Sequence, residues 1–203
     1  MFFYLMNKIF FLVFFLLLVL LTYHRNNIWK NEYTLWNNVV LKSHQKIIPH
    51  INLGNAFIRR GALDRAEKEF LSAFAINELD IRVHSGLGVI YFRNGLFDEA
   101  IKEFQLITTG KPDFAPGHNN LGVVYMEKGL LDEAIKEFKI TMRLDPYFPD
   151  AYSNLGLAYK KKGLLKEAME NLEQALTLSP EHRDAMRRMD EVMQLLQEKE
   201  TLK

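Results

Sequence analysis

Glycines recur at one constant step through most of the chain. An early set and a set seven residues further on keep this step, as do an alanine set and a set of large apolar residues. A constant period that is longer than one helix predicts a supersecondary unit that is repeated and stacks on its neighbours. The four sets are Gly54, Gly88, Gly122 and Gly156; Gly61, Gly95, Gly129 and Gly163; Ala66, Ala100, Ala134 and Ala168; and Phe70, Phe104, Phe138 and Leu172.

Each set has a physical reason within a pair of helices. The early glycine lets the two helices approach closely, and the second glycine supplies the positive φ of the turn between them. Ala100 is small where a neighbouring helix crosses, whereas Phe104 fills the space between helices. Pro112 stops the second helix. The pattern therefore predicts helix–turn–helix units and an all-α fold.

These columns resemble the tetratricopeptide repeat, a family whose unit is about 34 residues long. The resemblance covers about residues 47–182 and implies an α-solenoid of four units, 47–80, 81–114, 115–148 and 149–182. The methionines 186, 189 and 193 and Leu196 recur at helical spacing, which predicts a capping helix within 183–203. Residues 24–46 are predicted to be a linker with the second helix of an incomplete repeat, at about 28–43.

Residues 1–23 are predicted to be a membrane anchor. Every residue from Ile9 to Leu21 is apolar, and residues 2–6 extend the run to the length that a bilayer requires. The apolar run outweighs the insertion cost of Lys8. A cleaved signal peptide is the competing interpretation, but it requires small residues after the run, and the sequence there is Leu-Leu-Thr-Tyr-His-Arg. We therefore expect one transmembrane helix before the repeats.

Composition and motifs exclude several classes of function. Lys and Arg number 26 against 25 Asp and Glu, which argues against nucleic-acid binding, and the chain has no cysteine. The histidines 50, 84 and 118 share one column, but stacked helices lie about 8–10 Å apart and zinc ligands about 2 Å from the metal. We expect these histidines to have packing or surface roles. No catalytic, cofactor or metal site is predicted, and the chain is expected not to be an enzyme.

The resemblance implies that the first helix of each unit lines a concave groove that binds a polypeptide. Two residues before the early glycine stand Asn52, Gly86, Asn120 and Asn154. This column resembles the asparagine ladder of O-linked N-acetylglucosamine transferase, in which amides hydrogen-bond the backbone of a bound peptide. The alternative is that asparagine is simply usual here and makes local hydrogen bonds.

The predicted groove combines amides, apolar side chains and cations. The amides would contact a peptide backbone, the cations would favour acidic side chains, and the apolar residues would add contact area. The predicted peptide-binding residues are Asn52, Asn55, Arg59, Val89, Phe92, Arg93, Asn120, Val123, Met126, Asn154, Lys160 and Lys161. A chaperone tail is not expected, because Ile51 and Gly86 occupy places where the known carboxylate clamp of this family has Lys and Asn.

Residues 22–56 carry a second resemblance, to the boundary between the last membrane helix and the repeat domain of glycosyltransferase-C-like membrane proteins. The residues concerned are Thr22–Asn26, Trp29, Leu35–Trp36, Val39–Val40 and Asn52–Ala56. The resemblance implies an extracytoplasmic repeat domain and an alternative function, as an accessory or substrate-docking part of a membrane glycosyltransferase system. Self-association through the outer surface is expected if the groove is not used.

We expect the full chain to sediment with membranes and to resist extraction by alkaline carbonate, because residues 2–22 would span the bilayer. Deleting residues 1–23 should leave a helical protein in the soluble fraction. Release of the full chain by carbonate would show that the anchor prediction is wrong.

Overall fold

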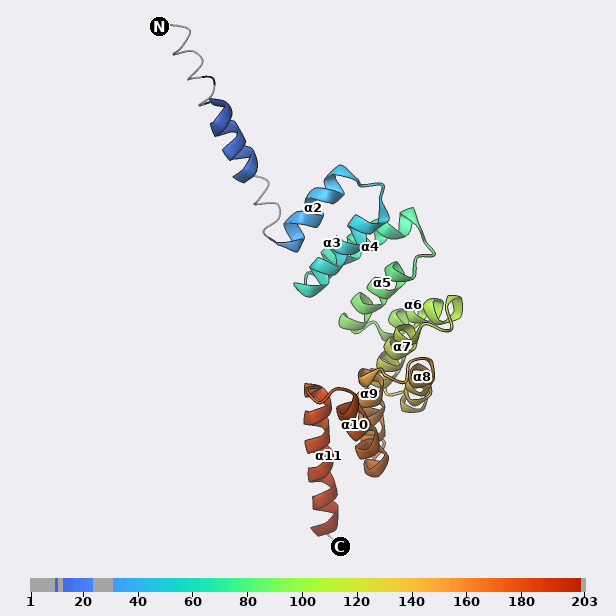
Figure 1. Cartoon of the computed structure of the whole chain (residues 1–203). Coiled ribbons are helices and arrows are strands. Elements are labelled where there is room, and N and C mark those ends of the chain that lie inside the picture. The colour runs from blue at the N-terminus through green and yellow to red at the C-terminus, as the bar shows by residue number, and fades with distance from the viewer. Residues whose placement is uncertain (1–9, 11–12, 24–30, 202–203) are drawn as a thin grey trace. The chain divides into compact units, whose positions relative to one another are not determined.

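A computed structural model describes residues 10, 13–23 and 31–201 of the chain (Figure 1). The described residues form helices and the turns between them, without strands. The chain divides into two compact units between Gly86 and Leu87, within one helix. The predicted all-α helical repeat is therefore confirmed, and each unit is considered by itself.

Successive helices keep the repeat register. The first unit holds α2 (Glu32–Lys42), α3 (Ile47–Arg59), α4 (Leu63–Ile76) and the start of α5 (Ile81–Arg93). The second unit holds the rest of α5 and α6 (Phe97–Gly110), α7 (Ala115–Glu127), α8 (Leu131–Leu144), α9 (Pro149–Lys161), α10 (Leu165–Leu178) and α11 (Arg183–Thr201). Because α11 begins as far after the start of α9 as α9 begins after the start of α7, it has the register of a further first helix.

Both glycine columns have the roles that the sequence predicted. A Cβ atom on Gly122 of α7 would lie 2.6 Å from Cε1 of Phe138 on α8, so only glycine allows this ring to lie against the helix backbone. The turn between the same two helices contains Gly129, whose φ is +86°. Ala134, one turn before Phe138, is fully buried. The hairpin thus depends on the Phe138 ring, which packs against the α7 backbone, and on a turn whose positive φ favours glycine.

Helix α11 buries a different face from the one that the methionine spacing suggested. Met189 is buried, but Met186 and Met193 are 42% and 43% exposed. The buried face instead contains Ala185 and Val192, which pack with α10 in a cluster that Leu196 joins from its edge. Met186 and Met193 fall in columns that face the second helix of a hairpin, and no second helix follows α11 in the described residues.

In the first unit, α2 is held against the end of α3. The rings of Tyr33 and Phe57 lie 5.2 Å apart, and the guanidinium of Arg60 lies 4.9 Å from the Tyr33 ring. Asn31 caps α2 by accepting from the backbone N–H of Thr34, and it also accepts from Arg60 at 3.2 Å. The incomplete repeat predicted at about 28–43 is therefore a helix over 32–42, and residues 24–30 lie outside the described residues.

The histidine column links the helices of a hairpin. In the first unit Nδ1 of His50 lies 2.7 Å from Oε2 of Glu69, and in the second Nδ1 of His118 lies 2.7 Å from Oε2 of Glu137. The other ring nitrogen of His118 lies 3.0 Å from the carbonyl oxygen of Pro112. These buried rings have a packing role, as the sequence predicted.

The predicted anchor lies partly outside the described residues, because residues 1–9, 11 and 12 are not among them. Residues 13–23 are helical, and their large apolar side chains are exposed. None of the described helices is both long enough and apolar enough to span a bilayer.

We predict that Ala134→Trp lowers the free energy of unfolding by at least ~1–3 kcal/mol, because the fully buried site has no room for an indole. The control is Lys102→Ala, an exposed position on α6, which should change stability by less than ~0.5 kcal/mol. Both are measured by thermal and denaturant unfolding followed by circular dichroism. Equal losses would contradict the assigned register.

Candidate functional site

Five of the predicted groove residues meet in a pocket of the second unit. The pocket has a volume of about 220 Å³ and lies between the C-terminal half of α5 and α7, over α6. Val89, Phe92, Arg93, Asn120 and Val123 line it together with Phe104 and Val124, which the sequence did not single out. It offers an apolar surface with one amide and one guanidinium.

The amide of Asn120 is available to a ligand. Its side chain is half-buried, and it forms no hydrogen bond with the described part of the chain. Val123 lies one turn further along α7 and is also half-buried. Phe92 rests against Phe97, with the ring centroids 6.0 Å apart. A carboxamide can donate and accept at once, which matches the two groups of a peptide bond.

Met126 does not belong to this surface, and the prediction for it is wrong. Its side chain is only 4% exposed and packs in the core formed by α7, α8 and α9, with Ala134, Phe138 and Leu155 as neighbours. Met126 follows Val123 by less than one turn of α7, but its longer side chain packs under α9. Met126 therefore belongs to the core of the stack.

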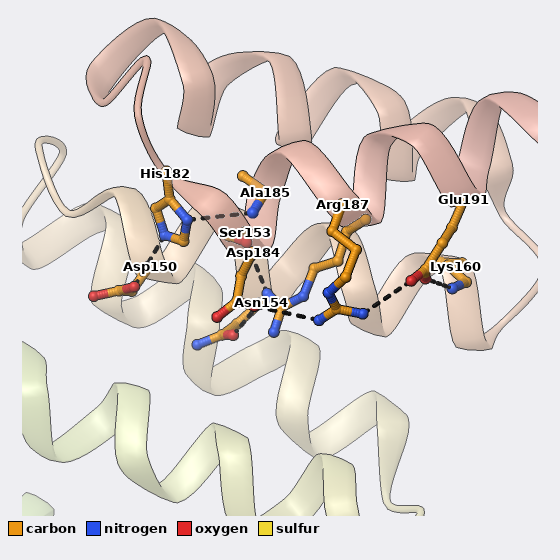
Figure 2. Close-up of polar contacts among 10 residues, drawn as sticks. Asp150, Ser153, Asn154, Lys160, His182, Asp184, Ala185, Arg187 and Glu191 are labelled. Atoms are coloured by element: carbon orange, nitrogen blue, oxygen red, sulfur yellow. Dashed lines mark hydrogen bonds and ion pairs between the residues drawn. The ribbon is translucent and has the colours of Figure 1, made fainter.

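At the other end of the second unit, α11 is attached to α9 by polar contacts (Figure 2). Nη1 of Arg188 donates to Oγ of Ser153 at 2.7 Å and to Oδ1 of Asn154 at 3.1 Å. Nδ2 of Asn154 in turn donates to Oδ1 of Asn119 on α7 at 3.2 Å. Burial lowers the pKa of Arg188 from its usual value, and its Nε is buried without a partner in the described residues.

The start of α11 is fixed by a histidine that has one defined tautomer. Nδ1 of His182 accepts from the backbone N–H of Ala185 at 3.2 Å, so the proton is on the other nitrogen. Nε2 then donates to Oδ1 of Asp150 on α9 at 3.0 Å. Figure 2 shows this ring between the two helices.

The two lysines predicted to attract acidic side chains have carboxylate partners within the chain. Lys160 forms an ion pair with Glu191 of α11, and by donating this hydrogen bond it lowers the pKa of the glutamate. Lys161 lies 3.4 Å from Glu127 at the end of α7. Glu191 also accepts from Arg187 at 2.9 Å. The positive charge at this end of the predicted groove is therefore largely compensated.

The asparagine column is thus not uniform. Asn154 is hydrogen-bonded within the chain, to Asn119 of α7 and Arg188 of α11, whereas Asn120 makes no hydrogen bond with the described residues. Gly86 interrupts the column for a steric reason: a Cβ atom there would lie 2.2 Å from Cε1 of Phe70. In the first unit Asn52 is half-buried on α3.

The two other groove residues of the first unit also lie on α3. Asn55 is half-buried, and Arg59 is exposed and forms an ion pair with Glu32 of α2. The groove assignment as a whole stays a prediction.

Antiparallel helix pairs that recur at a constant step define a helical-repeat protein. Models of the tetratricopeptide repeat match residues 51–118, 124–163 and 149–182. The chain therefore belongs to the tetratricopeptide-repeat proteins, which generally act as non-enzymatic scaffolds for other proteins. No curated protein matches the chain in sequence.

Solved structures of similar fold include three proteins. MamA is 25% identical over 71% of this chain and 85% of its own, with a TM-score of 0.62. A thermophilic tetratricopeptide-repeat protein of Thermus thermophilus is 22% identical over 79% of this chain and 88% of its own, with a TM-score of 0.71. The APC/C hetero-tetramer Cut9–Hcn1 is 23% identical over 72% of this chain and 30% of its own, with a TM-score of 0.67.

We predict that Arg188→Ala loosens α11, because it removes both hydrogen bonds to α9. The loss should be at the lower end of roughly 1–3 kcal/mol, since removing the guanidinium also relieves the buried Nε. Amide hydrogen exchange along α11 is the measurement. The matched control is Arg187→Ala, whose exposed side chain bonds only within α11; equal effects would contradict the assigned attachment.

Proposed function

We propose that the chain is a membrane-anchored scaffold that binds an extended segment of another polypeptide along the first helices of its hairpins. The observation that carries the proposal is the pocket between α5 and α7, where an unengaged amide stands beside apolar side chains. The family supports the class of function, because tetratricopeptide repeats bind protein or peptide partners. The structurally similar Cut9–Hcn1 hetero-tetramer is itself an assembly of different proteins.

The pocket favours a particular kind of peptide. Asn120 would pair with a backbone N–H and C=O of an extended strand, for which a carboxamide has the complementary groups. Val89, Phe92 and Val123 would enclose one apolar side chain of that strand. Arg93 at the rim would favour a carboxylate nearby. The expected ligand is an extended segment with an apolar residue next to an acidic one.

Binding is expected to centre on this pocket and not to extend evenly to α9. Asn154 and Lys160 are engaged by α11, so a ligand there would compete with contacts of the chain itself. Asn154 retains one N–H, because its Nδ2 donates once to Asn119 and the oxygen takes the bond from Arg188. A peptide would therefore contact α9 more weakly than α7.

Attachment to a membrane through residues 1–23 is part of the same proposal. The support is the apolar run of the sequence together with the helix over 13–23. The large apolar side chains of this helix are exposed, and a lipid bilayer would bury them. We propose an extracytoplasmic repeat domain, on the resemblance of residues 22–56. The alternative partner is a membrane glycosyltransferase. Such a partner should be recovered when the full chain is used as bait to capture proteins from membranes.

The proposal predicts that Asn120→Ala weakens peptide binding about two- to tenfold, because one amide–peptide contact contributes about 0.5–1.5 kcal/mol. Photo-crosslinking from position 89 of the full chain identifies the bound segment, and fluorescence anisotropy with the corresponding synthetic peptide measures its affinity. Val123→Asp should abolish binding by placing a charge in the apolar pocket.

The matched control is Asn171→Ala on α10, a half-buried amide outside the pocket. It should leave the peptide affinity unchanged, and all three variants should keep the circular dichroism of the wild type. Crosslinks that form equally well from a position on α10, with no effect of Asn120→Ala, would overturn the proposal.

A further inference from the structure

The outer face of α8 carries a stripe of positive charge. Lys136, Lys139 and Arg143 lie at successive helical turns, and all three side chains are exposed. None of them forms an ion pair with another described residue. The Nζ of Lys139 lies 5.8 Å from the centroid of the Tyr159 ring. The stripe therefore presents charge that the described part of the chain leaves uncompensated.

This face is also hollowed. A pocket of about 710 Å³ lies along α8, with the three cations at its edge and Ile135, Met142 and Tyr152 of α9 in its wall. A flat bilayer surface would not fill such a hollow, whereas a protruding row of side chains would. The occupant that fits is an acidic ridge on a protein.

Helix α10 carries exposed acidic residues in the same register. Its positions one repeat length after those of α8 carry the opposite charge: Asp132 is followed by Lys166, Lys136 by Glu170, and Lys139 by Glu173. Lys166, Glu170 and Glu173 are all exposed. Because α8 and α10 are the second helices of successive hairpins and both pack on α9, equivalent residues face the same side of the stack. Neighbouring helices thus form a paired positive and negative surface.

We propose that two copies of the chain associate through this face, with α8 of each copy against α10 of the other. A two-fold axis parallel to the two helices and midway between them places equivalent positions opposite each other. Lys136 then meets the second copy's Glu170, and Lys139 meets its Glu173. Asp132, which is paired with Lys162 and whose side chain is 82% exposed, meets the second copy's Lys166. These three columns are matched, and each match occurs twice. Arg143, the remaining cation of the stripe, falls opposite the uncharged Thr177 of the second copy.

One column with like charge on both helices lies off this surface. Glu133 and Glu167 share a column and a sign. At about 3.6 residues per turn, that column is about a quarter-turn away from the middle of the stripe. The contact is mainly polar, so its strength should come from charge complementarity and should fall steeply with ionic strength. We expect a weak, transient dimer.

The test exchanges the charges in two separate variants of the full chain, studied in a mild nonionic detergent by light scattering at low and at high salt. One variant carries Lys136→Glu with Lys139→Glu, which makes both helices acidic. The other carries Glu170→Lys with Glu173→Lys, which makes the facing stripes of both helices mainly basic. Wild type should approach twice the monomer mass of 23.8 kDa at low salt and lose dimer at high salt. Each variant alone should raise the dissociation constant at least about tenfold.

An equimolar mixture of the two variants should recover dimer at low salt, because each acidic face then meets a basic one. Lys102→Glu with Gln105→Glu changes the same columns on α6 and is the control, which should dimerise as wild type does. Wild type that stays monomeric at low salt would overturn the proposal, as would a dimer insensitive to salt and to both reversals. Failure of the mixture to recover would also overturn it.

A labelled acidic peptide, Glu-Glu-Phe-Glu-Glu, distinguishes a second copy of the chain from the other possible occupant, an acidic segment of a different protein. If the peptide binds to a monomeric wild type and Lys136→Glu with Lys139→Glu abolishes that binding, the face serves an acidic segment of another protein, and dimerisation is excluded. Competition of the peptide with the dimer would instead support the α8–α10 contact. The result is independent of the pocket between α5 and α7, so the peptide-binding proposal can fail or hold separately.

Discussion

The contact between a large side chain of the second helix and the backbone of the first determines how each hairpin closes. Phe138 lies where a Cβ atom on Gly122 would be, and Leu172 lies in the same way against Gly156. This contact sets the separation of the two helices, and with it the direction in which their other faces point. The pocket beside Asn120 and the charged stripe of α8 both follow from that geometry, since they occupy the faces that the contact leaves free.

The same packing explains which parts of the structure could be predicted from the sequence. Glycine, alanine and proline positions are decided within one hairpin, so their spacing is sufficient to place the helices and turns. Contacts between hairpins depend on side-chain length and rotation as well as on spacing. The distance of Met126 from Val123 suggests a common face, but the flexible side chain of Met126 fills the core beneath α9.

The sequence analysis did not predict how α11 is attached to α9, for a related reason. A capping helix is expected to cover an apolar edge and to turn its polar side to solvent. Arg188 stands one repeat length after Asn154, so extending the register into α11 places a guanidinium in the asparagine column. That signal is present in the sequence. The pairing of Lys160 with Glu191 has no comparable signal, because it depends on how α11 is rotated against α9.

The constant step of the register has a consequence for the length of the protein. The segments 95–104 and 129–138 are almost the same sequence, and α5, α7, α9 and α11 all begin at the same interval. Excising residues 115–148 would therefore join one helix end to the next helix start through an equivalent connection, and duplicating them would add a whole hairpin. Such a chain can grow or shrink only in complete modules, and each change of one module would separate or remove the neighbouring surfaces that α8 and α10 form together.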